Sequence, residues 1–413
     1  MLKRAGPLLA LVFVAFLTIS STLIISTTIT LNLDTSVLPK GISFSNRLLI
    51  YGAFMGALPL GQFFGAPIIG GLSDRLGRKR ILLIMLFCIS ICYVIVGMSL
   101  EMHRLLYFGI FMFVAGLFEG CVVLAQSVIS DLTDGKQRAE GLGLIVAMKS
   151  SGYVFGPSLA TILSDHHIVS WFRFSTPYFA FSIAFIAIFF WILFGFTETL
   201  PQEKRHQLPI LQNLTNMRYI ITNRKLRPLY LLNFLFYFGL YGFYRLYPAY
   251  IMNTYHLDQA DLGFIFTYFA ALQIGVTTSI LKFFSSRYSP YRLYQYSSMG
   301  LAIFILSILL IRPYPFQWIL LAIGSVAVGI SMAISQAIIS INSDQATQGR
   351  ALGNNLSIQF ITQIISSFAG SILAIYWIGL PLLVTALCAL IASIISFIIW
   401  RKREEAKKSS LDG

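Results

Sequence analysis

The chain has 413 residues, of which 57% are apolar and only 11% are charged. A soluble globular domain has about 25% charged residues, and its core must be covered by polar surface, so the composition excludes a soluble protein. The net charge of +14 does not indicate nucleic-acid binding, because the lysines and arginines are dispersed along the chain and not gathered in one patch. Cytoplasmic loops of membrane proteins are rich in these residues. We therefore predict a membrane protein whose partner is the lipid bilayer and not a nucleic acid.

Apolar runs of about 20 residues, the length that crosses a bilayer as a helix, recur along the whole chain. We predict twelve membrane-spanning helices, at residues 7–33, 47–70, 80–100, 104–130, 141–163, 177–197, 229–252, 259–282, 292–312, 316–341, 353–377 and 380–400. The first run is too long for the apolar region of a signal peptide, so it is counted as a span. The predicted fold class is an all-α membrane protein.

Lysines and arginines are divided unequally between alternate connections. With both termini in the cytoplasm, the predicted cytoplasmic segments contain 23 of them and the opposite side contains 5, as the positive-inside rule requires. The one long polar connection leaves six spans on either side of it. We therefore predict an N-terminal bundle at 1–197, a cytoplasmic linker at 198–228, a C-terminal bundle at 229–400 and a cytoplasmic tail at 401–413, in a protein of the cell (inner) membrane.

A dense group of charges connects the second and third predicted spans. Its pattern, Gly70-x-x-x-Asp74-Arg75-x-Gly77-Arg78-Lys79, resembles the loop 2–3 signature of the major facilitator superfamily. The resemblance implies the major facilitator fold, in which two six-helix bundles face each other across a central cavity. A short repeat of polar residues, beginning at Gln126 and again at Gln336 about 210 residues later, agrees with two related halves.

The resemblance also implies that this loop takes part in gating, and its residue types fit that role. Gly77 permits a tight turn, and Asp74 can accept hydrogen bonds from neighbouring helix N-termini. Arg78 can pair with Asp131 at the inner end of the fourth span. Together these contacts would hold the cytoplasmic face closed when the cavity opens outward. For Arg75 and the other cations, the alternative is that they only set the orientation in the membrane.

The fifth predicted span contains Gly152-x-x-x-Gly156-Pro157, which resembles the Gly-x-x-x-Gly-Pro motif of drug:proton antiporters. The stretch from Leu105 to Arg138 is similar to the fourth span of tetracycline-type exporters, although Ile110 occupies the place of an Arg in those exporters. The resemblance implies that Gly152, Gly156 and Pro157 take part in gating, and that transport is proton-coupled efflux.

Two ionisable side chains, Glu119 and Lys149, lie inside the fourth and fifth predicted spans, where charge is costly and usually functional. At 1.5 Å per residue, each lies roughly 13–16 Å from the inner end of its helix. Consecutive antiparallel helices are neighbours, so we predict that the two side chains meet as an ion pair. In one hypothesis Glu119 takes up and releases the coupled proton, while Lys149 exchanges between Glu119 and the substrate. In the alternative, the pair is static and fixes helix packing.

Arg245 lies among tyrosines of the seventh predicted span, including Tyr241 and Tyr244. A cation with aromatic walls suits an anionic or aromatic ligand, so we predict that these residues bind substrate. The alternative is an interfacial aromatic belt from which Arg245 reaches outward. Amide side chains of other spans are predicted to line the cavity and bind substrate, or else to bridge helices: Gln126, Gln273, Asn355 and Gln359.

The sequence lacks the Gly-x-x-x-x-Gly-Lys-Ser/Thr phosphate loop, so ATP hydrolysis within this chain is not expected. We predict no enzyme activity, no cofactor and no metal site, although His166 and His167 in an outer loop could sense pH or bind metal. The leading prediction is a monomeric, proton-coupled exporter of a small organic molecule that works by alternating access. One alternative is a transporter of an anionic metabolite or siderophore, which Lys149 and Arg245 favour. Another is a membrane receptor that does not transport.

Overall fold

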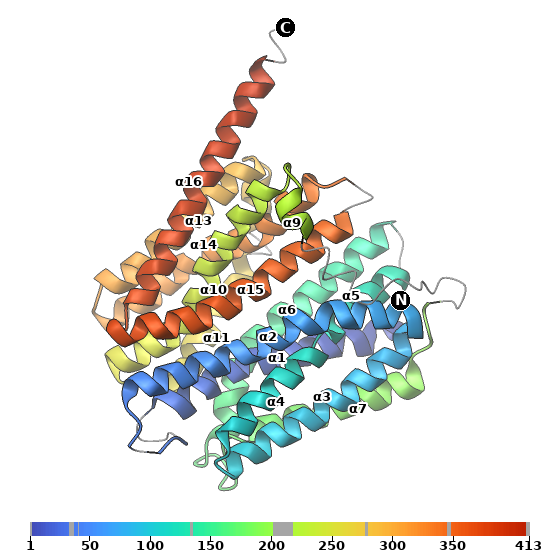
Figure 1. Cartoon of the computed structure of the whole chain (residues 1–413), viewed down its shortest axis with the longest axis vertical. Coiled ribbons are helices and arrows are strands. Elements are labelled where there is room, and N and C mark those ends of the chain that lie inside the picture. Colours follow the sequence, from blue (N-terminus) through green and yellow to red (C-terminus); the bar gives the residue numbers. More distant parts are fainter. Residues whose placement is uncertain are drawn as a thin grey trace. The chain divides into compact units, whose positions relative to one another are not determined.

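The computed structural model describes residues 2–32, 37–39, 41–132, 135–200, 218–276, 280–344 and 348–409. Within these ranges the chain forms α-helices with short connections and no strand (Figure 1), which confirms the all-α prediction. The chain forms two compact units. Unit 1 contains Met1–Thr215 and Leu257–Thr267, and unit 2 contains Asn216–His256 and Tyr268–Gly413.

Unit 1 is built from helices that pack in pairs. They are α1 (Leu2–Leu31), α2 (Phe44–Leu76), α3 (Arg78–Glu101), α4 (Leu105–Phe118), α5 (Cys121–Leu132), α6 (Gly135–Ser164), α7 (Thr176–Gly195) and the first part of α11 (Gln259–Gly275). Helix α1 packs along α6, α2 along α4 and α3 along α7. Large apolar side chains also lie on the outer faces, such as Ile183 and Phe194 of α7, which are 70% and 82% exposed. Helices that are apolar on all sides are typical of membrane proteins.

Unit 2 contains α9 (Arg218–Thr222), α10 (Arg227–Tyr255), the rest of α11, α12 (Leu281–Ser285), α13 (Pro290–Leu310), α14 (Tyr314–Ile341), α15 (Gln348–Tyr376) and α16 (Leu380–Ser409). Helix α10 packs along α15 and α16, and α13 packs along α14 and α16.

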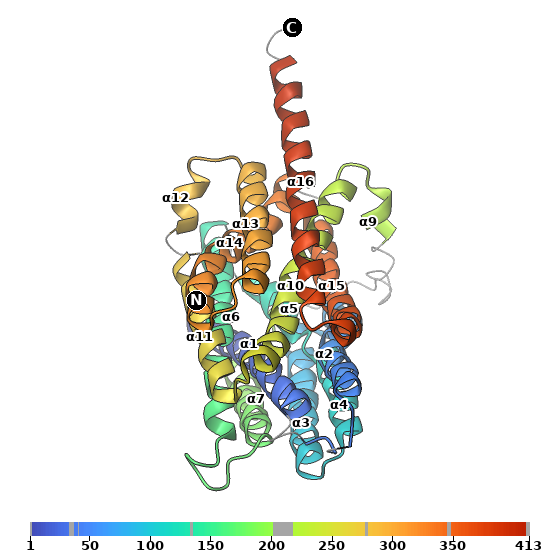
Figure 2. The ribbon, with the colours of Figure 1, turned by 90° about the vertical axis from the view of Figure 1, so that its left-hand side faces the viewer.

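The C-terminal end of α16 projects as a continuous helix (Figure 2). Residues 401–409 of the predicted tail are therefore helical. Arg403 donates a hydrogen bond of 2.6 Å to Asn342 and lies 4.5 Å from the ring centre of Tyr291, so the projecting end is fastened to α13 and α14.

Nine helical segments of the described chain are long and apolar enough, by length and composition, to cross a membrane. The predicted spans at 141–163, 229–252 and 259–282 correspond to α6, α10 and α11, which are outside this set. Helices α6 and α10 contain polar residues on which the functional predictions depend, and polar residues lower the mean hydropathy of a helix. The described part of α11 has 17 residues and is too short for this set. The count of twelve spans therefore stays a prediction.

Helices α2 and α4 are in direct backbone contact, because glycines lie where they cross. A Cβ atom on Gly61 would lie 2.1 Å from the carbonyl oxygen of Phe113, and one on Gly116 would lie 2.1 Å from that of Leu58. Small residues allow membrane helices to approach this closely. The contact brings the polar side chains of α2 to the C-terminal end of α4, where the candidate site begins.

We expect Gly116→Ala to lower the free energy of unfolding by about 1–3 kcal/mol, the usual cost of overpacking, because the backbone of α2 blocks the added methyl group. The thermal unfolding midpoint of the detergent-purified protein measures this effect. Gly143→Ala is the matched control, since no atom lies within 4 Å of a Cβ at that position and only helix propensity changes. Equal unfolding midpoints for Gly116→Ala and the wild type would contradict the close contact.

Candidate functional site

The turn predicted at Gly77 is present and separates α2 from α3. Gly77 has a φ of 97° and is the one described glycine with a positive φ. Side chains of L-residues rarely adopt this region, so the turn favours glycine. Just before the turn, the Gly70 carbonyl accepts a hydrogen bond of 2.8 Å from the hydroxyl of Ser73. Arg75 is exposed.

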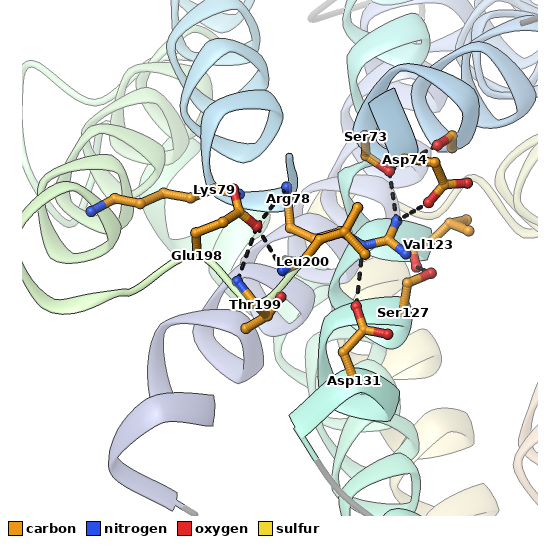
Figure 3. Close-up of polar contacts among 11 residues, drawn as sticks. Ser73, Asp74, Arg78, Lys79, Val123, Ser127, Asp131, Glu198, Thr199 and Leu200 are labelled. Atoms are coloured by element: carbon orange, nitrogen blue, oxygen red, sulfur yellow. Dashed lines mark hydrogen bonds and ion pairs between the residues drawn. The ribbon is translucent and has the colours of Figure 1, made fainter. Parts of the chain in front are cut away.

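Arg78, the first residue of α3, joins the ends of three helices (Figure 3). Its Nη1 lies 2.8 Å from a carboxylate oxygen of Asp74 in α2 and 2.7 Å from the hydroxyl of Ser73. Its Nε lies 3.2 Å from a carboxylate oxygen of Asp131 in α5. The predicted contact between Arg78 and Asp131 therefore exists. The guanidinium is shared with Asp74, so it does not form a two-bond pair with Asp131 alone.

Glu198, and not Asp74, accepts the hydrogen bonds of the nearby helix N-terminus, which corrects the expectation for Asp74. One Glu198 carboxylate oxygen lies 2.9 Å from the backbone nitrogen of Arg78, and the other lies 3.2 Å from that of Lys79 (Figure 3). The first oxygen also accepts from the backbone nitrogens of Thr199 and Leu200, both at 3.0 Å. An anion at a helix N-terminus is stabilised by the unpaired N–H groups and the helix dipole. The first residue of the predicted linker is therefore attached to the start of α3.

Glu198→Ala should lower the free energy of unfolding by about 0.5–2 kcal/mol, the range measured for lost helix caps, because the first N–H groups of α3 lose their acceptor. Glu198→Gln keeps one acceptor oxygen and should lose less. Thermal unfolding of the purified protein tests both variants. Glu404→Ala, an exposed carboxylate of α16, is the control. A loss at Glu198 no larger than that at Glu404 would contradict the capping role.

Glu119 lies at an interruption of the fourth predicted span, which is not one continuous helix. Helix α4 ends at Phe118, Glu119 and Gly120 form a turn, and α5 begins at Cys121. Glu119 is only 3% exposed. A carboxyl group at this position projects from the end of a helix and meets the helices beside it.

Two neutral side chains donate hydrogen bonds to the Glu119 carboxylate. Nε2 of Gln62, from α2, and the hydroxyl of Tyr93, from α3, each lie 2.6 Å from a different carboxylate oxygen. The Tyr93 ring is fully buried and stacks on Phe185 of α7, with ring centres 5.7 Å apart and planes 7° apart. Packing therefore fixes the direction of the Tyr93 hydroxyl. Sequence reasoning missed both donors, because nothing local distinguishes a glutamine or a tyrosine that faces a carboxylate on a different helix.

The predicted ion pair between Glu119 and Lys149 is wrong. Among the described residues no carboxylate lies within 4.0 Å of the Lys149 ammonium group, which instead lies 4.7 Å from the ring centre of Phe16 in α1. The two side chains do not meet because they lie on helix faces that point towards different neighbouring helices. Helix α6 turns this side towards α1, and a Cβ on Gly152, three residues on, would lie 2.6 Å from the Phe13 carbonyl oxygen.

The motif Gly152-x-x-x-Gly156-Pro157 lies on α6 at its contact with α1. The Ser21 hydroxyl of α1 donates a hydrogen bond of 2.7 Å to the Gly156 carbonyl, and a Cβ on Gly156 would lie 2.5 Å from the Leu17 carbonyl oxygen. Pro157 follows inside the same helix. The three residues thus permit close packing within unit 1.

In unit 2, the predicted cavity amides Asn355 and Gln359 are buried at the contact of α15 with α10, where they are 1% and 4% exposed. Asn355 accepts a hydrogen bond of 2.8 Å from Asn233, and Gln359 accepts one of 3.1 Å from the Tyr241 hydroxyl. Gln359 also donates to the Tyr237 hydroxyl at 3.2 Å. These amides therefore bridge helices. The fully buried Asn233 was not among the predicted site residues, although a lone amide in an apolar span signals such a network.

Arg245 and the remaining predicted substrate residues lie at the more open part of the same unit. Arg245 donates a hydrogen bond of 2.9 Å to Gln363 of α15, and Gln273 of α11 donates one of 2.6 Å to the Tyr244 hydroxyl. Arg245, Tyr244 and Gln273 are each partly exposed. In unit 1, Gln126 of α5 is exposed.

Comparisons with known proteins agree with this architecture. The family model described as Major Facilitator Superfamily matches residues 8–311 and 229–412. The major facilitator superfamily domain-containing protein 10 of Mus musculus is 31% identical over 160 residues, which are 39% of this chain and 32% of that protein. The tetracycline resistance protein, class H, of Pasteurella multocida is 24% identical over 386 residues, which are 89% of this chain and 91% of that protein.

A crystal structure of the human organic anion transporter MFSD10 (TETRAN) has a similar fold. It matches 95% of this chain and 99% of its own chain with a TM-score of 0.72, at 18% sequence identity. The family match defines a multi-pass membrane protein of the secondary-transporter class, and the similar structure shows the same fold. The chain belongs to the major facilitator superfamily.

Proposed function

We propose that this chain is a proton-coupled transporter that exports a small organic molecule by alternating access. The observation that carries the proposal is the environment of Glu119. The carboxyl group is buried, lies at a helix interruption and is held by two neutral donors, Gln62 and Tyr93. No cation neutralises it among the described residues within 4.0 Å.

Neutral partners suit a group that binds and releases a proton. A carboxylate in an ion pair must break that pair before it is protonated, which is costly in a buried setting. Glu119 has no such pair to break. When it is protonated, its O–H can donate to the Tyr93 oxygen while Gln62 still donates to the other oxygen, so both states are hydrogen-bonded. Alternating access would expose this group to each side of the membrane in turn.

The direction and substrate are proposed from the relatives and from the open part of unit 2. The class H tetracycline resistance protein aligns over nearly its whole length, which supports efflux of a drug-like molecule. Tyr244, Arg245 and Gln273 are partly exposed and offer aromatic, cationic and amide groups to such a ligand. Tyr241 is buried beside them, and we propose that it supports this site from behind. Both termini would lie in the cytoplasm of a monomeric inner-membrane protein, since the positive-inside count favours that orientation.

The turn at Gly77 is the proposed gate. Arg78 connects α2, α3 and α5 at one end of unit 1, and Glu198 attaches the linker to the same point. Movement of α5 relative to α2 would separate Asp131 from Arg78, so the charge cluster would favour one of the two access states. Gly152, Gly156 and Pro157 would let α6 slide along α1 in the same transition.

Glu119→Gln should abolish proton-driven transport while leaving substrate binding in place, because the amide is nearly the same size but cannot carry a proton. Proteoliposomes with an imposed pH gradient and tetracycline or ethidium as probe measure the driven flux. Glu140→Gln, an exposed acid of α6, is the matched control and should transport normally. Full pH-driven flux in Glu119→Gln would exclude this carboxyl group as the proton carrier.

A second candidate substrate class is an organic anion. The partly exposed Arg245 supports it, and human MFSD10, which has a similar fold, is an organic anion transporter. In this case Arg245→Ala should reduce uptake of fluorescein, a fluorescent anion, by about tenfold or more, the cost of losing one charge-assisted hydrogen bond to the ligand. Ethidium, a cation, should be transported as before or better. Normal transport of fluorescein together with reduced transport of ethidium in Arg245→Ala would instead favour export of drug-like molecules.

A further inference from the structure

Three side chains with metal-binding chemistry gather where α6 ends. Asp165, His166 and His167 directly follow Ser164, and their potential ligand atoms all lie within 4.8 Å of one another. The two imidazole rings have centres 4.0 Å apart. This cluster belongs to the connection between α6 and α7, at the opposite end of unit 1 from the turn at Gly77 (Figure 1).

The donor set suits one kind of ion. Two imidazoles and a carboxylate are common ligands of Zn²⁺ and similar transition metals, whereas Mg²⁺ and Ca²⁺ prefer oxygen ligands alone. The Asp165 carboxylate is already oriented, because one of its oxygens accepts a hydrogen bond of 2.8 Å from the backbone nitrogen of His167.

A pocket of about 440 Å³ adjoins the cluster, and His166 forms part of its wall. The other lining residues include Glu101, which is held by Arg173 at 2.8 Å and by the Ser175 hydroxyl. The hydroxyl of Ser164 is a buried atom of this wall without a hydrogen-bond partner in the described chain. The pocket thus offers room for water or a small ligand beside His166, and a polar group to hold it.

We propose that Asp165, His166 and His167 bind one divalent transition-metal ion at the rim of this pocket, with the fourth coordination position open to it. Ligand atoms of a tetrahedral zinc site are roughly 3.3–3.5 Å apart, given bonds of about 2.0–2.1 Å. The potential ligand atoms lie within 4.8 Å of one another, so metal binding would draw them closer together. Both imidazoles are exposed. In the proposed topology the site faces the outside of the cell.

Isothermal titration of Zn²⁺ into the purified, tag-free full chain tests the site. The wild type should bind one ion, and His166→Ala/His167→Ala should bind at least about tenfold more weakly, a loss at least as large as that for removing a second-shell partner. Asp165→Asn keeps the hydrogen bond to His167 but loses the charge, so it should weaken binding without altering the loop. His103→Ala, a histidine in the same pocket wall but outside the cluster, should bind like the wild type.

Co²⁺ gives an independent readout, since tetrahedral coordination by the cluster produces strong visible absorption bands that the double variant should lack. Gel filtration and metal-free thermal unfolding confirm that each variant is folded. Absence of wild-type binding, unchanged affinity in the double variant, or an equal loss in His103→Ala would overturn the proposal. None of these outcomes depends on Glu119 or on transport activity, so the two proposals fail separately.

Discussion

A carboxyl group inside a membrane-spanning bundle needs hydrogen-bond donors, and much of unit 1 is arranged to supply them to Glu119. An unsatisfied or charged group in an apolar interior costs several kcal/mol. The glycine contact between α2 and α4 brings Gln62 within reach, and stacking on Phe185 directs the Tyr93 hydroxyl. The end of α4 at Phe118 then lets Glu119 project between them.

Glu119 and Arg78, the two polar centres of unit 1, have opposite kinds of partner. Around Glu119 the partners are neutral and buried, so protonation removes no ion pair. Around Arg78 the partners are charged and closer to water, with Asp74 and Asp131 side chains 48% and 31% exposed. The Arg78 side chain itself is only 11% exposed. If Asp131 moves away, the guanidinium stays paired with Asp74 and is not left as an unpaired buried charge. The gate proposed at the turn at Gly77 requires a cluster of this kind.

Structural features that depend on a short stretch of sequence were the ones predicted best. Helix positions follow from apolar runs, and the turn at Gly77 follows from a short motif between two helices. The Arg78–Asp131 contact joins residues 53 positions apart, and it was predicted because both were expected at the inner ends of spans. Glu198 was not recognised, because the residue that caps α3 lies 120 positions along the chain from Arg78. Its only sequence signal is an acid directly after an apolar run.

The remaining differences between prediction and structure arise because sequence gives the depth of a residue in the membrane but not the direction in which its helix face points. The rise per residue placed Glu119 and Lys149 at similar depths, but depth does not tell which neighbour a helix face meets. Lys149 faces α1, while Glu119 faces α2 and α3. Likewise the amides of α15 were expected to line a cavity or to bridge helices, and two of them pair with Asn233 and Tyr241 of α10. Partners on distant helices become visible only when the packing is known.

The interruption at Glu119 also bears on how the chain enters the membrane. Helix α4 has 14 residues and is about 21 Å long, whereas the hydrocarbon core is about 30 Å thick. Helix α4 alone is too short to span it, so α4 and α5 must be inserted together, with the turn between them covered by protein. Synthesis delivers α2 and α3 first. Gln62 and Tyr93 are therefore already in the bilayer when the carboxyl group that they bind arrives.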